Sequence, residues 1–96
     1  AVGLSICEDI WDPATAMAAR DAGAALIVNL NASPYSLHKR AARLRALGTA
    51  VSSAGLPIAY VNLVGGQDEL VFDGGSLAID AHGQVVAEAN EFEEAL

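Results

Sequence analysis

The sequence predicts a layered α/β domain whose sheet is parallel in its first part and antiparallel at one edge. Short apolar runs alternate with two segments of helical pattern in the order β-α-β-α-β, which is typical of parallel strands joined by helices. The run Ala24–Leu30 is apolar over the length of a strand, as in strands covered on both faces. Two further runs, Gly75–Asp80 and Gln84–Glu88, flank the turn Ala81-His82-Gly83 and predict an antiparallel hairpin.

The elements of the first half have recognisable ends. Ala1–Ile6 is short and apolar and predicts a buried strand. Asp12 is suited to the N-cap of a helix, and Pro13 to the first helical position, where its missing N–H costs nothing. The alanine-rich helix Ala14–Ala22 then ends at Gly23.

In the second half, one long helix comes before the third strand. Apolar residues at helical spacing predict an amphipathic helix over Leu37–Ala54, which Gly55 ends. Ile58–Val64 predicts a third buried strand, and Gly65–Asp73 predicts a polar loop.

Composition excludes several classes of protein. The 96 residues suffice for one domain, and 53% of them are apolar, which excludes a disordered chain. The net charge of −7 argues against nucleic acid or an anionic membrane as a partner. No apolar run approaches the roughly 20 residues of a membrane span. The single cysteine fits a reducing compartment, so we expect a cytoplasmic protein. Because residue 1 already lies in an apolar run, we also expect a piece of a longer protein.

Cys7 is the first candidate for chemistry. It follows a predicted strand and precedes a turn into a helix, at the sheet edge where ligands bind in open α/β sheets. Glu8 and Asp9 beside it disfavour the thiolate, and the local sequence supplies no compensating cation. A small buried thiol without reactivity is the alternative. A metal site over this segment is disfavoured, because it would combine a thiolate with carboxylates and no histidine.

A second candidate segment follows the next strand and should share the same sheet edge. It contains Ser33 and leads to Lys39 near the start of a helix, where the helix dipole disfavours a cation. A bound anionic group would relieve this, so we assign Lys39 to such a group. For Arg43 and Arg45 we expect carboxylates of the protein itself as partners. A third, acidic and glycine-rich segment, Gly65–Ser76, follows the third strand and should reach the same edge.

Three segments carry a resemblance to a known family: Ile6-Cys7-Glu8-Asp9-Ile10-Trp11, Asn31-Ala32-Ser33-Pro34-Tyr35 with Lys39-Arg40, and Tyr60–Gly74. The first resembles the nucleophile segment of the nitrilase superfamily of carbon–nitrogen hydrolases. Together they resemble the glutaminase domains of glutamine-dependent NAD synthetases. The resemblance implies part of a nitrilase-like α-β-β-α sandwich, with a mixed sheet and helices on one face.

The resemblance also implies roles for particular residues. Cys7 matches the nucleophile of a Cys-Glu-Lys triad, which attacks the side-chain amide of glutamine. The backbone N–H of Glu8 would help to hold the oxyanion. Ser33 and Lys39 match positions that bind glutamine. The chain would need no cofactor of its own, whereas ATP and Mg would belong to the synthetase domain that amidates deamido-NAD. The parent would be a homo-oligomer.

The resemblance implies that residues 1–96 are the C-terminal portion of the glutaminase domain. In the family, the Glu and Lys of the triad lie upstream of the nucleophile and the ATP-binding domain lies downstream. We therefore expect the chain alone to be inactive. Two other readings remain open: a stand-alone nitrilase-family amidase or carbamoylase, and a non-catalytic α/β module in which Cys7 only fills the core.

Overall fold

The computed structural model describes all residues from 1 to 96 as one mixed five-stranded sheet with a small hairpin beside it. Two α-helices and a short 3₁₀ helix, η1, accompany the strands. The elements run in chain order as β1 (Val2–Ile6), η1 (Cys7–Trp11), α1 (Pro13–Asp21), β2 (Leu26–Asn31), α2 (Lys39–Ala54), β3 (Ile58–Asn62), β4 (Val64–Gln67), β5 (Leu70–Asp73), β6 (Leu77–Ile79) and β7 (Val85–Glu88).

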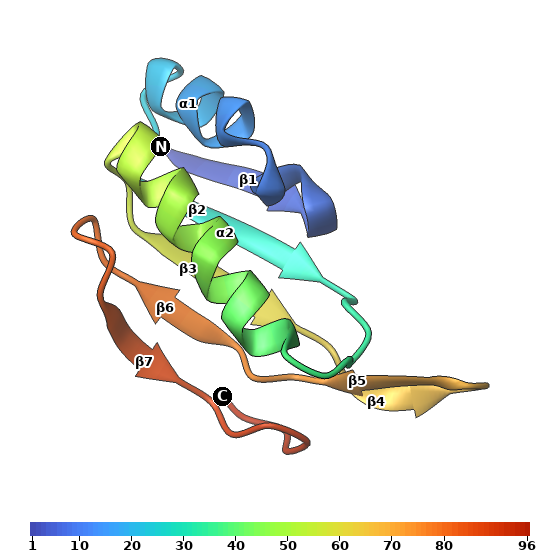
Figure 1. Cartoon of the computed structure of the whole chain (residues 1–96). Coiled ribbons are helices and arrows are strands. Elements are labelled where there is room, and N and C mark those ends of the chain that lie inside the picture. Colours follow the sequence, from blue (N-terminus) through green and yellow to red (C-terminus); the bar gives the residue numbers. More distant parts are fainter.

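The sheet has the order β1-β2-β3-β6-β7 (Figure 1). β1, β2 and β3 are parallel, and β6 and β7 continue the sheet in antiparallel pairing. The predicted mixed α/β class is therefore confirmed. Because the three parallel strands share a direction, their carboxyl ends meet at one edge, where the segments with Cys7 and Ser33 follow them.

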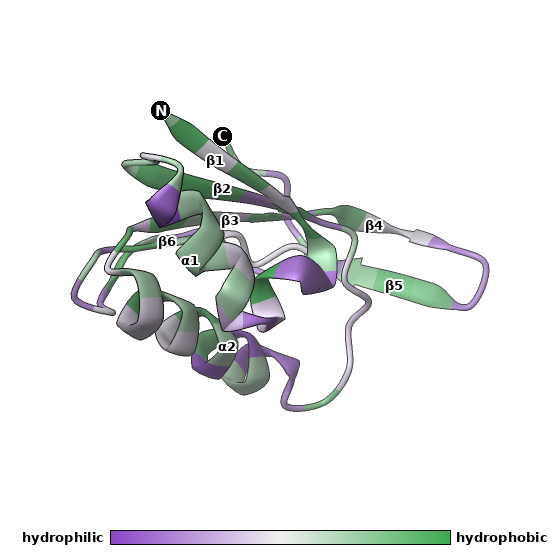
Figure 2. Ribbon diagram, turned by 90° about the horizontal axis from the view of Figure 1, so that it is seen from above, coloured by the Kyte–Doolittle hydropathy of each residue, from purple (hydrophilic) through white to green (hydrophobic).

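Both α-helices pack on the same face of the sheet (Figure 2). Their alanine, leucine and valine side chains form one core with the strand residues beneath them; its fully buried members include Ala16, Ile27, Leu47, Ile58 and Tyr60. The opposite face carries no helix, and alternate strand residues such as Leu4 point to it and are exposed. None of the helices has the length and apolarity that a membrane-spanning segment needs.

The predicted caps are present at both α-helices. The Asp12 carboxylate accepts a hydrogen bond from the Ala14 N–H at 2.9 Å, with Pro13 in the first helical position. Gly23, after α1, and Gly55, at the end of α2, both have positive φ, which glycine adopts without strain. The start of α2 differs: it begins at Lys39 rather than Leu37, because His38 has a φ of +65°.

The prediction of a polar loop over Gly65–Asp73 was wrong. β4 and β5 form an antiparallel hairpin there, with Gly65 paired to Phe72 and Gly66 to Val71 (Figure 1). Glycine and glutamine have weak strand propensity, so β4 had no local signal. β4 is stabilised by its pairing with β5. The Tyr35 N–H in turn donates to the Val71 carbonyl of β5 at 2.7 Å. The hairpin thus connects the segment after β2 to the segment after β3.

Candidate active site

Cys7 lies directly after β1 in a left-handed backbone conformation, with a φ of +51°. This conformation is uncommon for a non-glycine residue, and here it turns the chain from the strand into η1. The Asp9 carboxylate closes the turn by accepting a hydrogen bond from the Ile6 N–H at 3.2 Å. The thiol is half-buried and forms no disulfide. Cys7 therefore occupies the strand-to-helix junction that the sequence predicts.

Two buried asparagines hold the chain at this edge. Asn29 on β2 donates from its amide to the Cys7 carbonyl at 3.3 Å and to the Ser5 hydroxyl at 2.8 Å. Asn62 on β3 accepts from the Ser33 N–H at 3.0 Å and donates to the Gly74 carbonyl at 2.9 Å. Each asparagine fastens a loop that follows a neighbouring strand, so the three segments predicted to share an edge do meet there.

Ser33 is buried by this arrangement. Its N–H is bound by Asn62, and its carbonyl accepts from Arg43 at 3.2 Å. Its hydroxyl lies close to the Tyr60 phenol and acts to lower the pKa of that phenol, against the larger effect of burial. The backbone of Ser33 is therefore held on both sides, by Asn62 and by Arg43.

Arg43 and Asp73 form a buried, two-bonded ion pair beneath Ser33. The guanidinium donates to the two carboxylate oxygens at 2.6 and 2.8 Å, and the side chains are 2% and 1% exposed. Burial by itself would raise the pKa of Asp73, but the hydrogen bonds and the charge of Arg43, together with a backbone hydrogen bond and the charge of Lys39, lower that pKa. The expectation that Arg43 pairs with a carboxylate of the protein is confirmed, whereas the exposed Arg45 forms no ion pair.

Tyr60 adds a second buried polar group to this part of the core. Its side chain is 1% exposed, and its hydroxyl has no hydrogen-bond partner. Burial raises the pKa of the Tyr60 phenol, with the cation of Arg43 acting in the opposite sense. The phenol therefore stays protonated at neutral pH.

Lys39 lies half-buried at the first residue of α2. Its Nζ is 5.3 Å from the centroid of the Trp11 ring, within the range of a cation–π interaction. Glu8, Trp11, Asp12 and Lys39 together line a cavity of about 480 Å³. One ammonium, two carboxylates and an aromatic face are groups suited to a small zwitterion. Neither Cys7 nor Ser33 lines this cavity.

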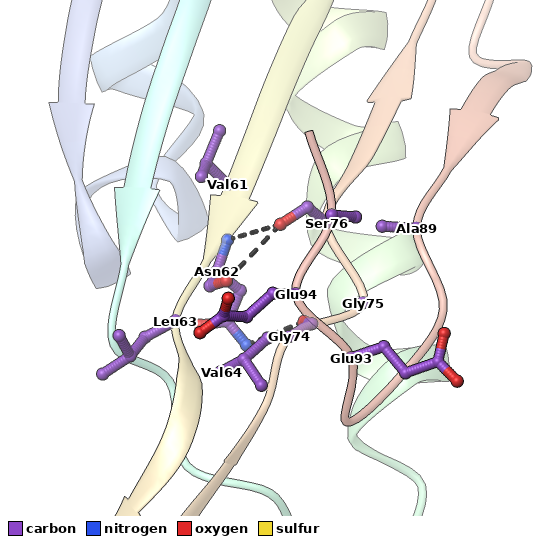
Figure 3. A pocket seen from close by; sticks show the side chains of 11 residues that line it. Val61, Asn62, Leu63, Val64, Gly74, Gly75, Ser76, Ala89, Glu93 and Glu94 are labelled. Carbon is purple, nitrogen blue, oxygen red and sulfur yellow. Dashed lines mark hydrogen bonds between the residues drawn. The ribbon is translucent and has the colours of Figure 1, made fainter.

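A separate cavity of about 370 Å³ lies beside the C-terminal segment (Figure 3). The Asn62 N–H donates to the Ser76 hydroxyl at 2.9 Å on its wall, and Glu94 points toward it. Asn62 and Gly74 line this cavity, whereas Cys7, Ser33 and Lys39 do not. Among the histidine, cysteine and acidic side chains, no group of three or more could hold a metal ion.

Several residues of the site escaped the sequence analysis. Asn29 was predicted to end an apolar strand and begin the second candidate segment, and Asp73 to lie in the third, but neither was given a role of its own. The available signal was the repetition of asparagine at the carboxyl ends of two strands, where a hydrophobic residue would otherwise be expected: Asn29 and Asn31 on β2, and Asn62 on β3.

This geometry accompanies a match over residues 1–96 to the family model described as carbon–nitrogen hydrolase. The chain belongs to the carbon–nitrogen hydrolase family. Among curated relatives, the glutamine-dependent NAD(+) synthetase of Thermotoga maritima is 47% identical over 95 residues, which cover 97% of this chain and 16% of the relative. That of Aquifex aeolicus is 50% identical over 98 residues, covering 97% and 17%. This carbon–nitrogen hydrolase chain thus spans only about one sixth of the length of those relatives.

Solved structures give the same result. The glutamine-dependent NAD+ synthetase of Acinetobacter baumannii, in complex with ADP, superposes with a TM-score of 0.90 at 37% identity, over 98% of this chain and 18% of that one. An amidase of Nesterenkonia, a nitrilase-superfamily enzyme, superposes with a TM-score of 0.81 at 29% identity, over 93% and 33%. In a mutant of that amidase, the acetamide moiety of fluoroacetamide is covalently added at the active-site cysteine.

Proposed function

We propose that this chain is the nucleophile-bearing portion of a domain that hydrolyses the side-chain amide of glutamine. The ammonia released would serve a synthetase domain of the same polypeptide, which amidates deamido-NAD to NAD. The observation that carries the proposal is the position of Cys7 directly after β1, in a left-handed conformation fastened from below by Asn29. The similarity to glutamine-dependent NAD synthetases supports glutamine as the substrate.

The proposed reaction has two steps. The Cys7 thiolate attacks the amide carbon of glutamine, forming a carbon–sulfur bond and an oxyanion that the Glu8 N–H helps to stabilise. The carbon–nitrogen bond then breaks, and the nitrogen takes a proton and leaves as ammonia. Water attacks the carbonyl carbon of the resulting thioester and gives a proton to a general base. The carbon–sulfur bond then breaks, which releases glutamate and regenerates the Cys7 thiolate. We assign the general base and the lysine of the triad to sequence that precedes residue 1 in the longer protein.

Ser33 and Lys39 are proposed to bind the α-substituents of glutamine. Two features support this: the position of Ser33 at the sheet edge, where Asn62 binds its N–H, and the ammonium of Lys39 in a cavity lined by polar groups. The Trp11 ring beneath Lys39 would restrict the ammonium to one side of the cavity. ATP and Mg²⁺ would bind in the synthetase domain, outside this chain.

The test is a Cys7→Ala substitution in the full-length protein. We expect glutamine-dependent NAD synthesis to fall by at least about a thousandfold, because the thiolate is lost. Ammonia-dependent synthesis should persist, because it bypasses the hydrolytic step, and it therefore serves as the internal control for folding. Glutamine-dependent synthesis within about tenfold of the parent rate would refute the nucleophile assignment.

A stand-alone amidase is the second candidate, supported by the likeness to the Nesterenkonia amidase. It makes a different prediction for the same full-length protein. Simple aliphatic amides would be hydrolysed at rates comparable to glutamine, and ATP with deamido-NAD would yield no NAD. The higher identity to the synthetases favours the first proposal.

A further inference from the structure

The side chain of Asn29 donates a hydrogen bond to the peptide group between Cys7 and Glu8. Asn29 is fully buried, at 0% exposure, in the middle of the parallel sheet. One amide hydrogen is donated to the Cys7 carbonyl at 3.3 Å and the other to the Ser5 hydroxyl at 2.8 Å. Its carbonyl oxygen accepts from the amide of Asn31. The side chain is thus held from both ends and has little rotational freedom.

The hydrogen bond from Asn29 to the Cys7 carbonyl also determines the direction of the Glu8 N–H. The Cys7–Glu8 peptide is trans, so the Cys7 C=O and the Glu8 N–H point in opposite directions across one plane. With the carbonyl directed down to Asn29, the Glu8 N–H is directed away from β2. Glu8 also lies in the first turn of η1, where N–H groups have no partner within the helix. A hydrogen bond to the carbonyl further polarises the peptide and strengthens its N–H as a donor.

We infer that Asn29 is a positioning residue, which orients the Glu8 N–H toward the oxyanion formed when Cys7 attacks an amide. This inference rests on the proposed function. Asn29 does not touch the substrate and acts through the peptide that it holds. A fully buried amide is costly unless its hydrogen bonds are made, and the Asn29 side chain bonds to Ser5, Cys7 and Asn31.

The test measures glutamine hydrolysis by full-length Asn29→Ala and Asn29→Leu variants. Removing an oxyanion donor outright lowers kcat by about 10²- to 10³-fold, so for misdirecting one we expect a fall of about 10- to 100-fold. KM should change by less than about threefold, because the interaction exists only in the transition state. Asn29→Leu keeps the branched shape of the side chain and removes its hydrogen bonds without adding a charge, so it separates the lost hydrogen bond from a cavity effect.

A second readout distinguishes orientation of the peptide from general damage. Alkylation of Cys7 by iodoacetamide forms no oxyanion, so its rate should stay within about threefold of the parent in both variants. Ser5→Ala removes the other support of the Asn29 amide and should lower kcat by about two- to tenfold. It provides the decisive measurement if the Asn29 variants fail to fold.

Ile58→Val is the matched control. Ile58 is buried on the same sheet face as Asn29, at the start of the neighbouring strand β3. It should lower the Tm by about 2–4 °C and leave kcat unchanged. An unchanged kcat in the Asn29 variants, a parallel loss of alkylation, or a rise in KM alone would overturn the inference. Glutamine hydrolysis that survives Cys7→Ala would instead refute the proposed function, so the two failures are distinguishable.

Discussion

At the scale of single residues, charged side chains in this chain occupy two different environments. Arg43 and Asp73 are buried together under Ser33 and have all their charge neutralised within the protein. Lys39 has no carboxylate within ion-pair distance and lies against the Trp11 ring in a polar cavity. A buried pair contributes to the shape of the site, whereas an unpaired ammonium is available to a ligand.

Removing the charge of Lys39 tests its assigned role in binding glutamine. Lys39→Ala in the full-length protein should raise KM for glutamine by about 10- to 150-fold, because a charge-assisted hydrogen bond to a carboxylate is lost. Ser33→Ala should raise it by about two- to tenfold. Arg45→Ala, an exposed basic residue of the same helix, is the control and should leave glutamine kinetics unchanged. Equal KM values for glutamine in all three variants would contradict the role of Lys39 in binding glutamine.

Breaking the Arg43–Asp73 pair should destabilise the domain strongly. Asp73→Asn leaves the guanidinium buried without its counter-charge, at a cost of about 3–5 kcal/mol in the free energy of unfolding. The double variant Arg43→Met/Asp73→Leu should recover most of this loss, because no unpaired charge remains. The stability is measured by thermal or urea unfolding, and a single variant as stable as the parent would contradict the prediction.

The same pair predicts the response to acid. The pKa of Asp73 is lower in the folded state than in the unfolded state, so its contribution is complete above the unfolded value near pH 4. The contribution is lost as the pH falls further, through the folded value. Unfolding midpoints recorded between about pH 7 and pH 3 should therefore fall less steeply at the acid end in the double variant than in the parent.

At the scale of elements, close packing decides how α1 and β1 fit together. A Cβ atom built on Gly3 would lie 2.9 Å from the Cβ of Ala19 on α1, so a side chain at this position would push the helix away from the sheet. β1 leads directly into η1 at Cys7. Glycine at position 3 therefore allows α1 to pack closely on β1.

Gly3→Ala should lower the free energy of unfolding by about 1–3 kcal/mol through overpacking. Gly48→Ala is the matched control, because a Cβ there meets nothing within 4 Å and the residue lies inside α2. That substitution should stabilise the protein by about 0.5–1 kcal/mol through helix propensity. Equal effects of the two substitutions on the unfolding midpoint would show that the contact between β1 and α1 is not close-packed.

At the scale of the whole molecule, the sheet is covered on one face only (Figure 2). The uncovered face carries large apolar side chains that are 46% to 76% exposed: Val2, Leu4, Ile6, Leu30 and Val61. Contiguous apolar surface of this kind is typical of a protein–protein or interdomain interface. β1 and β7 are also open edge strands, each with a row of unpaired backbone groups.

Residues 1–96 expressed alone should therefore self-associate and show no glutaminase activity. The activity is expected to be absent because members of a triad act as a unit, and the partners of Cys7 are assigned to the longer protein. Leu4→Lys on the uncovered face should reduce the association measured by sedimentation velocity. Leu37→Lys, equally exposed at 76% but away from that face, is the control and should not. A monomeric chain with Cys7-dependent turnover would contradict both expectations.

Much of the candidate site was accessible from the sequence, because its signals are local. The position of Cys7 after a strand, the caps Asp12 and Gly55, and the pairing of Arg43 with a carboxylate all follow from residue type and spacing. The contacts of Asn29 and the hairpin of β4 with β5 do not. Each depends on a partner from another segment, for example Ser5 for Asn29, and local patterns carry no information about such partners.

By itself, therefore, the sequence determined the mixed α/β class, the cap of α1 at Asp12, the end of α2 at Gly55 and the candidate nucleophile, since hydrophobic period and capping act over a few residues. Only the tertiary structure decided which residues hold that nucleophile. The parallel register aligns Ser5 with Asn29 on neighbouring strands, and this alignment brings a buried amide under the Cys7 carbonyl. Register is set by the packing of whole strands against a common core, so its consequences appear only when the strands are assembled.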